Sequence, residues 1–230
     1  MTKTKNHKER KKNSSSANLV FWVGGIVIIC IIGFIVLGSR QQKEGTFDYK
    51  NEPFIGDKAA KVNIVEFGDY KCPVCKNFNQ DFFPIIKKKF VDSGQAKFYF
   101  MNYAFINVDS KRAAKFAETV YKELGNDTFW KFHHLLYEKQ PDDPKYEKMD
   151  YFTDSFLEKT LTEVASKKDA EKVMDAYNNS EALDYYDKDM NYVKKLKINS
   201  TPTIFVNGKQ FTGRTLDDLT EMVNKAEKGS

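Results

Sequence analysis

The stretch VEFGDYKCPVCKNFNQDFFP, residues 65–84, joins a short apolar run to a segment in which two residues separate two cysteines. The apolar run covers residues 62–67 and is closed by a glycine, which is typical of a buried strand too short for a free-standing helix. Pro73 is tolerated in the first turn of a helix, and apolar side chains recur at helical spacing over residues 74–85. The stretch therefore predicts a strand that leads into a helix at the cysteines, with Pro84 kinking or ending that helix.

The segments farther along the chain extend this α/β pattern. Residues 97–103 (KFYFMNY) are rich in aromatic side chains and predict a second buried strand. Residues 203–206 predict a third strand, and the Asn-Gly pair at 207–208 is a strong signal for a hairpin into residues 209–211. Thr215 begins a sequence that resembles a capping box, and it predicts a last helix.

The middle of the chain carries helical periodicity and no comparable strand signal. Asp109 can cap the first helix of this region and Gly125 can stop it. Further helices are expected around residues 128–139, 153–166, 169–178 and 181–197, with an acidic, proline-bearing loop at 141–144. The order of elements predicts one α/β domain that is interrupted by an all-helical insertion of about 90 residues.

The positive net charge of the chain is confined to its N-terminus. Residues 1–18 hold six of the 37 basic residues and one of the 32 acidic residues, which leaves 31 of each in the remainder. The part of the chain that is expected to fold is therefore neutral. Its charge gives no support for binding DNA or RNA.

The basic tail precedes an uncharged apolar run from Leu19 to Leu37. As a helix, these 19 residues span about 28 Å, close to the hydrocarbon thickness of a bilayer. The run predicts a transmembrane anchor, and the preceding basic residues keep the N-terminus cytoplasmic. A signal peptide cleaved after Gly38 is the alternative, but the apolar run is longer than such peptides usually have. Cys30 lies inside the run and is interpreted as an apolar residue of the anchor without a chemical role.

The predicted organisation has six parts. The N-terminal parts are a basic cytoplasmic tail (1–18), a transmembrane signal-anchor (19–37) and an extracytoplasmic linker (38–60). A first α/β part (61–108), the helical insertion (109–198) and a second α/β part (199–228) follow. Either form of the N-terminus, anchored or cleaved, places the folded domain outside the cytoplasm.

Metal and haem sites explain the cysteine pair poorly. A structural zinc site needs four ligands, but the histidines expected in the folded part are the adjacent His133 and His134, which are expected to pack or to meet solvent. Covalent haem attachment needs histidine after the second cysteine, where Lys76 stands. No metal and no bound cofactor are therefore expected at the pair. Four acidic residues could hold calcium if the fold brought some of them together: Asp142, Asp143, Asp187 and Asp189. They are interpreted as solvated surface charge.

The position of Cys72 and Cys75 favours redox chemistry over a structural disulfide. A disulfide that closes so short a loop removes little chain entropy and stabilises a fold only weakly. Cys72 is expected at the leading end of a helix, where free backbone N–H groups favour its thiolate, and Cys75 lies deeper on the same face. Lys71 and Lys76 add positive charge nearby or are ordinary solvated residues. The pair therefore indicates thiol–disulfide exchange.

Three regions of the chain resemble the DsbA-like branch of the thioredoxin superfamily, in particular the membrane-anchored disulfide-bond formation protein D type of Gram-positive bacteria. These are VEFGDYKCPVC with its nucleophilic first cysteine, the helical insertion, and NSTPTIFVNGK, which matches the cis-proline segment of the family. The resemblance covers about residues 52–228. It implies a thioredoxin fold with an inserted helical subdomain.

The resemblance also implies roles for individual residues. Cys72 corresponds to the exposed attacking sulfur and Cys75 to the resolving one. Glu66 matches a buried acid that assists proton transfer beneath the disulfide, although a structural acid with satisfied hydrogen bonds is the alternative. Thr201 and Pro202 correspond to a loop that faces the disulfide through a cis bond, and the Thr201 backbone could pair with an extended substrate.

The two residues between the cysteines are assigned, with Thr201, to the surface that meets substrate. Pro73 matches the proline that the family places after its nucleophile. Val74 stands where many members have histidine, whose positive charge would favour the Cys72 thiolate further. Because this histidine is absent, the sequence does not determine how strong an oxidant the Cys72–Cys75 disulfide is.

The sequence therefore predicts an extracytoplasmic thiol:disulfide oxidoreductase that introduces disulfide bonds into exported proteins. It needs no bound cofactor, and by resemblance a quinone-coupled membrane partner or small oxidants would re-oxidise it. Two alternatives stay open at this point. One is a reductase or isomerase on the same fold, and the other is a surface binding module in which the disulfide is passive.

Overall fold

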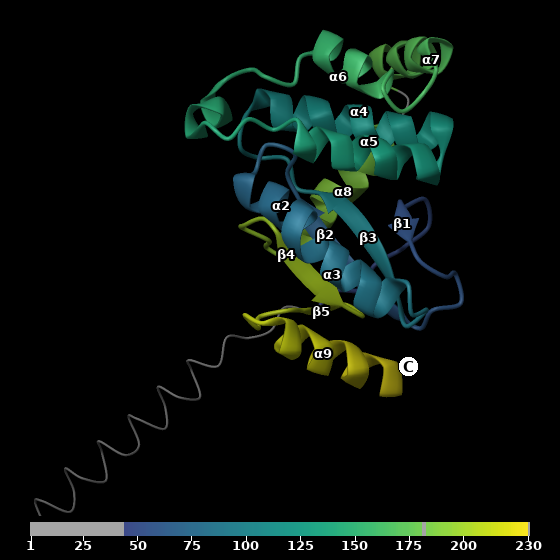
Figure 1. Ribbon diagram of the computed structural model, residues 1–230, viewed down its shortest axis with the longest axis vertical. Helices are drawn as coiled ribbons and strands as arrows, with labels where there is room; N and C mark the ends of the chain where they lie inside the picture. Colours follow the sequence, from purple (N-terminus) through teal and green to yellow (C-terminus); the bar gives the residue numbers. More distant parts are fainter. Residues whose placement is uncertain (1–43, 181–182, 230) are drawn as a thin grey trace, which may run out of the picture. The chain divides into compact units, whose positions relative to one another are not determined.

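The computed structural model describes residues 44–180 and 183–229, which build a five-stranded sheet of order β1-β3-β2-β4-β5 (Figure 1). The central strands β2 and β3 are parallel, whereas β1, β4 and β5 run antiparallel to their neighbours. The strands cover Phe54–Ile55 (β1), Val62–Gly68 (β2), Ala96–Asn102 (β3), Thr203–Val206 (β4) and Lys209–Gln210 (β5). The strands that the sequence predicts are all present.

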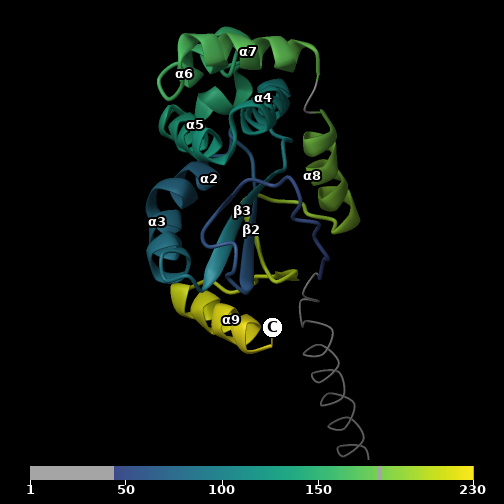
Figure 2. The same ribbon diagram turned by 90° about the vertical axis from the view of Figure 1, so that its right-hand side faces the viewer.

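The side chains of β2 alternate between two separate cores, as the pleat of a strand requires. Val62 and Ile64 belong to the larger core, whereas Val65 and Phe67 belong to the smaller one. Helix α9 (Leu216–Lys228) packs on the larger core, and α8 (Leu183–Lys195) contributes to the smaller one. Figure 2 shows α8 and the helical segment of α2 and α3 on opposite sides of the sheet.

A long helical segment follows the cysteines and does not end at Pro84. It comprises α2 (Pro73–Asn77), α3 (Phe83–Ile86) and two π-helical turns at Phe78–Phe82 and Lys87–Val91. Pro84 lies in the first turn of α3, directly after the first π turn, where a proline that lacks an N–H is tolerated. The helical conformation therefore continues to Val91, so of the two expected effects of Pro84, a kink or an ending, the ending is wrong.

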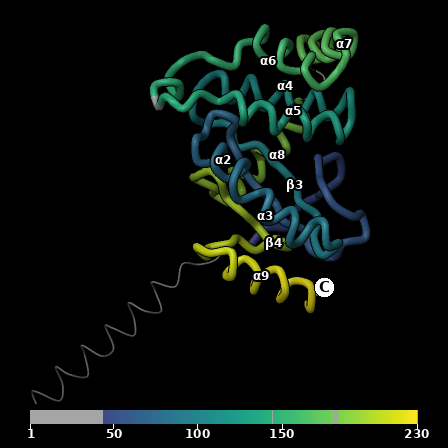
Figure 3. Tube along the Cα trace, in the orientation of Figure 1, coloured from purple at the N-terminus to yellow at the C-terminus, as the bar shows by residue number. Residues whose placement is uncertain are grey.

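The predicted helical insertion lies between β3 and β4, and Figure 3 traces how the chain leaves the sheet and returns to it. Helices α4 and α5 form one layer and α6 and α7 a second one (Figure 1). Gly125, at φ 79, separates α4 from α5, as the sequence predicts. The helices cover Val108–Leu124 (α4), Asn126–Glu138 (α5), Asp154–Leu161 (α6) and Lys167–Asn178 (α7), with a short 3-10 helix at Pro144–Lys148.

The first helix of the insertion is capped by Asn107 and not by Asp109. The Asn107 side chain accepts a hydrogen bond from the backbone N–H of Val108 at 2.8 Å and completes a capping box with Ser110. Asp109 points inward, because it forms a fully buried ion pair with Lys71. The expected capping role of Asp109 is therefore wrong. The second predicted capping box, of Thr215 and Asp218, is present at the start of α9.

Residues 44–60 belong to the folded domain, although the sequence indicates a linker over 38–60. Phe47 is buried in the smaller core, and Phe54 of β1 pairs with Tyr99 of β3. The Phe47 ring contacts Phe67 of β2 and Phe205 of β4, so the segment has a packing role. The part of the predicted linker that the structure describes is thus an edge of the domain.

The predicted cytoplasmic tail and transmembrane anchor lie outside the described residues. Within residues 44–180 and 183–229, no helix combines the length and the apolar character that crossing a membrane would need.

Candidate active site

Cys72 lies at the junction of the β2 loop and α2 and is the N-cap of that helix. Its Sγ accepts a hydrogen bond from the backbone N–H of Cys75 over 3.4 Å. The pKa of Cys72 is lowered to about 6, first because the Cys75 thiol donates a hydrogen bond to its sulfur, against the opposing effect of burial. Backbone N–H groups of Val74 and Cys75 lower this pKa further. The helix start therefore favours the Cys72 thiolate, as the sequence predicts.

Cys75 has the opposite tendency. Its side chain is fully buried, and burial raises its pKa well above the ordinary value, with the hydrogen bond to Cys72 adding to the effect. The two sulfurs therefore differ in the way that an attacking and a resolving cysteine must differ. Cys72 itself is only 6% exposed, less than the exposed sulfur that the resemblance implies, whereas Val74 beside it is 59% exposed.

Glu66 is buried in β2 beneath the cysteine pair. Its neighbours in the sheet are Phe100 of β3 and Ile204 of β4, both apolar. Burial raises the pKa of Glu66 well above its ordinary value, and the negative charge of Cys72 raises it further. Its Oε1 has no hydrogen-bond partner among the described residues, so the alternative of a fully satisfied structural acid does not fit.

The Thr201-Pro202 bond is cis, as the resemblance implies, and the loop that contains it faces Cys72. Cys72 Sγ lies 3.6 Å from the carbonyl oxygen of Thr201, to which the thiol donates a hydrogen bond. The strand β4 begins directly after this loop, at Thr203, and pairs with β2. The pairing of β4 with β2 thus brings together the two sequence segments that carry the candidate site.

Lys71, next to Cys72, is buried and not solvated. Its Nζ lies 2.5 Å from Asp109 Oδ2, and both side chains are 0% exposed. The Nζ also donates to the carbonyl oxygen of Met149 and lies 4.9 Å from the centre of the Tyr146 ring. Asp109 Oδ2 additionally accepts the N–H groups of residues 151 and 152. This ion pair connects the turn at residues 69–72, called the cysteine turn below, to the helical insertion, and no local sequence pattern indicates it.

Gln140 makes a second connection between the insertion and the cysteine turn. Its Nε2 donates to the carbonyl oxygens of Tyr70 at 2.8 Å and Cys72 at 3.2 Å. The backbone carbonyl oxygen of Gln140 accepts a hydrogen bond from Lys76 Nζ at 2.7 Å. No local motif marks Gln140, because the contact spans 68 residues of sequence. The backbone around the cysteines is thus held by side chains that lie far away in the chain.

The histidine pair takes part in packing. His133 is fully buried and hydrogen-bonds to the Tyr70 hydroxyl at 3.0 Å through Nδ1 and to the Asn79 amide at 3.1 Å through Nε2. Burial lowers the pKa of His133 well below its usual range and that of His134 to about 4. Both imidazoles are neutral at physiological pH, so the prediction that His133 packs is confirmed.

The four aspartates considered for calcium do not come together. Asp142, Asp143 and Asp187 are exposed, whereas Asp189 is buried and accepts hydrogen bonds from the backbone N–H and the side chain of Asn102. The expectation of solvated charge is therefore wrong for Asp189. Within the described ranges, no group of three or more His, Cys, Asp or Glu residues is arranged to hold a metal ion.

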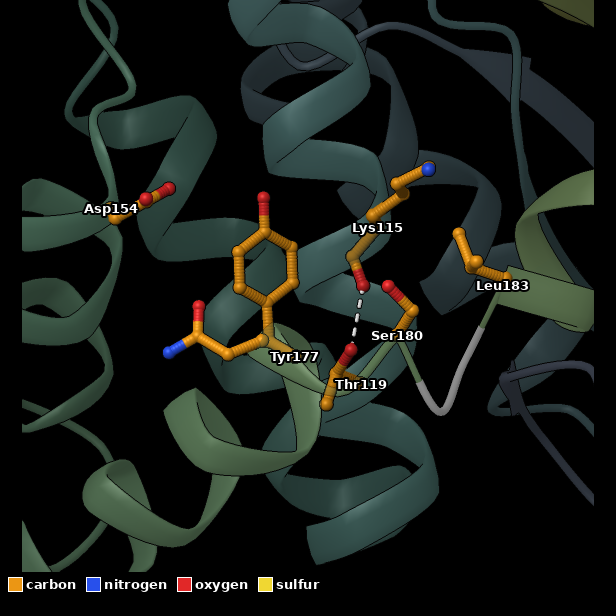
Figure 4. Close-up of a pocket in the computed structure, with 7 residues that line it drawn as sticks. Lys115, Thr119, Asp154, Tyr177, Ser180 and Leu183 are labelled. Carbon is orange, nitrogen blue, oxygen red and sulfur yellow. Dashed lines mark hydrogen bonds between the residues drawn. The ribbon is translucent and has the colours of Figure 1, made fainter.

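A separate pocket of about 310 Å³ lies within the helical insertion (Figure 4). Lys115, Thr119, Asp154 and Tyr177 are among the residues that line it, and Thr119 Oγ1 donates to the backbone carbonyl of Lys115. None of the residues predicted from the sequence for the site lines this pocket. The chemistry described above therefore belongs to the junction of β2 and α2.

Comparison with known proteins finds a thioredoxin family. The family model described as thioredoxin matches residues 48–225. Disulfide bond formation protein D of Bacillus subtilis is 39% identical over 181 residues, which cover 78% of this chain and 79% of that protein. A probable disulfide bond formation protein D of Bacillus cereus is 28% identical over 211 residues, which cover 91% and 95% of the two chains.

Solved structures agree with these relatives. The crystal structure of oxidised BdbD from Bacillus subtilis has a TM-score of 0.74 at 37% identity and covers 82% of this chain and 99% of that one. The structure of DsbA from Chlamydia trachomatis has a TM-score of 0.66 at 23% identity, covers 81% and 95% of the two chains, and shows the shared fold. The predicted thioredoxin fold with a helical insertion is confirmed.

Proposed function

Because this chain belongs to the thioredoxin family and is a thiol:disulfide oxidoreductase, we propose that it uses Cys72 and Cys75 to oxidise exported proteins outside the cytoplasm. The observation that carries the oxidase role is the unequal acidity of the two sulfurs, since the pKa of Cys72 is lowered to about 6 and that of Cys75 is raised. A thiolate that is stable in the reduced enzyme makes the disulfide form a stronger oxidant.

The reaction has two exchange steps. A substrate thiolate attacks Cys72 Sγ in the oxidised enzyme, the Cys72–Cys75 bond breaks, and its electron pair goes to Cys75. The neutral Glu66 carboxyl gives its proton to the Cys75 thiolate. A second substrate thiolate then attacks the substrate sulfur of the mixed disulfide and expels Cys72 as a thiolate. The substrate loses two electrons to the enzyme, which becomes the dithiol.

The surface around Cys72 supports the approach of an unfolded substrate. Val74 is 59% exposed. Exposed apolar side chains also occur at Phe105 and Met149, in loops that hydrogen bonds connect to residues 69 and 71, and at Val108, the first residue of α4. We assign Pro73 and Val74 to apolar contacts with substrate. The backbone of Thr201, whose carbonyl oxygen faces Cys72 Sγ, is assigned to strand-like hydrogen bonds with it.

The location and the partners are proposed from the sequence. The basic tail and the apolar run of residues 19–37 support a single-pass anchor with the folded domain outside the cytoplasm. The dithiol that each cycle leaves must be re-oxidised by an external acceptor. The resemblance favours a quinone-coupled membrane partner, and small oxidants are the second source.

The resting redox state of the pair in cells tests the direction of electron flow. We expect Cys72 and Cys75 to be mostly disulfide-bonded in a Cys30→Ser background, because an oxidase must be in its disulfide form before it meets a substrate. Cells are quenched in acid, free thiols are alkylated with a mass tag, and the chain is resolved by its mass shift. A sample reduced before alkylation gives the fully tagged reference. A pair that is mostly tagged without that reduction would contradict the oxidase and support the reductase or isomerase.

A further inference from the structure

Two polar atoms on the larger-core face of β2 lack partners in the surroundings that the structure describes. Glu66 and Gly68 are two residues apart, so both face the same side of the sheet, the side on which Cys75 lies. Among residues 44–180 and 183–229, Oε1 of Glu66 has no hydrogen-bond partner, and neither has the hydroxyl of Tyr137, a 0% exposed side chain of α5. A buried polar atom without a partner costs free energy of folding and is uncommon, so two of them near Cys75 indicate a functional role.

Gly68 is the reason that the Tyr137 hydroxyl reaches the strand. A Cβ at Gly68 would lie 3.0 Å from that hydroxyl oxygen and 2.5 Å from a ring carbon of Phe100. A side chain at this position would therefore displace the phenol. The glycine leaves an opening one pleat away from Glu66, and the helical insertion fills it with a hydroxyl group.

We propose that Tyr137 is a positioning residue for proton transfer at Cys75. The Tyr137 hydroxyl makes no hydrogen bond to Glu66 in the structure, where both cysteines are free thiols, and it donates one to the Glu66 carboxylate only while Glu66 is ionised. This inference rests on the proposed oxidase cycle. When the disulfide opens, Glu66 gives its proton to Cys75 and gains a negative charge in a buried place. The phenol stabilises that charge without losing its own proton. The hydrogen bond is released when Glu66 regains a proton, either from water in the dithiol enzyme or from Cys75 when the dithiol is re-oxidised.

The electrostatics of the surroundings agree with this role. Burial raises the pKa of Tyr137 well above its usual value, and the negative charges of Cys75 and Glu66 raise it further. The phenol therefore keeps its proton and donates a hydrogen bond to an ionised neighbour. The titratable groups around Glu66 and Tyr137, from the cysteine turn, α2 and α5, are Asp69, Tyr70, Cys72, Cys75 and His133. β3 and β4 contribute the apolar Phe100 and Ile204 next to Glu66.

Reduction of the oxidised enzyme by dithiothreitol tests the inference. The rate is measured by stopped flow from pH 5 to 10 on the full chain in detergent and divided by the concentration of reductant thiolate. The normalised rate should fall as Glu66 ionises, because only its neutral form supplies a proton to Cys75. In Tyr137→Phe we expect an about tenfold lower rate, the loss expected for a hydrogen bond to a charged group. The pH at which the normalised rate halves should rise by about one unit.

Three comparisons keep the test specific. Tyr186→Phe removes the same atom from a 5% exposed tyrosine of α8 and should leave both quantities unchanged. In a Glu66→Gln background, Tyr137→Phe should have no further effect, because the group that it serves is gone. Thermal unfolding checks that Tyr137→Phe folds, and loss of a hydroxyl without a partner should leave that stability nearly unchanged.

The outcomes separate this inference from the proposed function. The role of Tyr137 is supported if Tyr137→Phe lowers the rate about tenfold and raises the pH of the midpoint, and if neither effect is seen in the Glu66→Gln background. An unchanged profile in an active, folded Tyr137→Phe enzyme overturns it and leaves the oxidase intact. A wild-type protein that cannot oxidise thiols overturns the proposed function itself.

Discussion

Replacing Cys75 with serine should trap exported proteins on Cys72 as mixed disulfides and abolish turnover. Cys72 has the lowered pKa and can still exchange with a substrate disulfide, or form a disulfide with a substrate thiol when the external acceptor that re-oxidises the enzyme takes up the two electrons. The Cys75→Ser variant has no second thiol to resolve the product. Complexes are detected as high-mass bands of a tagged Cys75→Ser chain on non-reducing gels, and they should disappear on reduction. Mass spectrometry of the bands identifies the linked cysteines.

The reciprocal variant is the matched control. Cys72→Ser leaves a sulfur that is fully buried and has a raised pKa, so we expect no complexes from it. Both variants carry Cys30→Ser, which removes the third cysteine of the chain. If Cys75→Ser gave no mixed disulfides either, the pair would be a passive disulfide, and the chain would be better explained as a surface binding module.

Lys71→Met should lower the free energy of unfolding by about 3–5 kcal/mol, because it leaves the Asp109 carboxylate buried without its cation. Both side chains of this pair are 0% exposed, and the acid joins the cysteine turn to the insertion. Urea unfolding followed by the fluorescence of the buried Trp130 measures the loss. The same substitution at Lys87, whose pair with Asp92 is 40% and 50% exposed, should cost less than about 1 kcal/mol.

A second substitution shows whether charge is the cause. Asp109→Asn in the Lys71→Met background should restore part of the lost stability, since the amide is neutral and its oxygen still accepts the N–H groups of residues 151 and 152. Equal, small losses for Lys71→Met and Lys87→Met would contradict a buried ion pair. No gain from the added Asp109→Asn would contradict an uncompensated charge.

Strands β2 to β5 and the position of the cysteine pair could be predicted because short-range patterns determine them, whereas β1 lies in the segment that was predicted as a linker. The apolar run of β2, the aromatic run of β3 and the Asn-Gly hairpin each carry their signal within a few residues. The start of a helix at Pro73 placed Cys72 at an N-cap, and this followed from residue spacing alone. The cis bond before Pro202 and the buried acid at Glu66 came from the resemblance, since local patterns do not distinguish them.

The remaining parts of the site depend on contacts between segments that are far apart in sequence. Asp109 has the residue type of a helix cap, but its pairing with Lys71 across 38 residues turns it inward and leaves capping to Asn107. Gln140 and Tyr137 look like ordinary residues at the end of a helix until the fold brings them over the cysteine turn. Tertiary contacts of this kind override local propensity.

The rate of Cys72 alkylation as a function of pH tests the central claim directly. Iodoacetamide reacts with the thiolate, so the rate in the reduced Cys30→Ser protein should rise with pH through a midpoint at about 6, the pKa that the Cys75 hydrogen bond and the start of α2 impose on Cys72. The rate should be lost below that pH as the thiolate gains a proton. Cys75 is buried with a raised pKa and should contribute little. A midpoint near 9, the value of an ordinary thiol, would contradict the account.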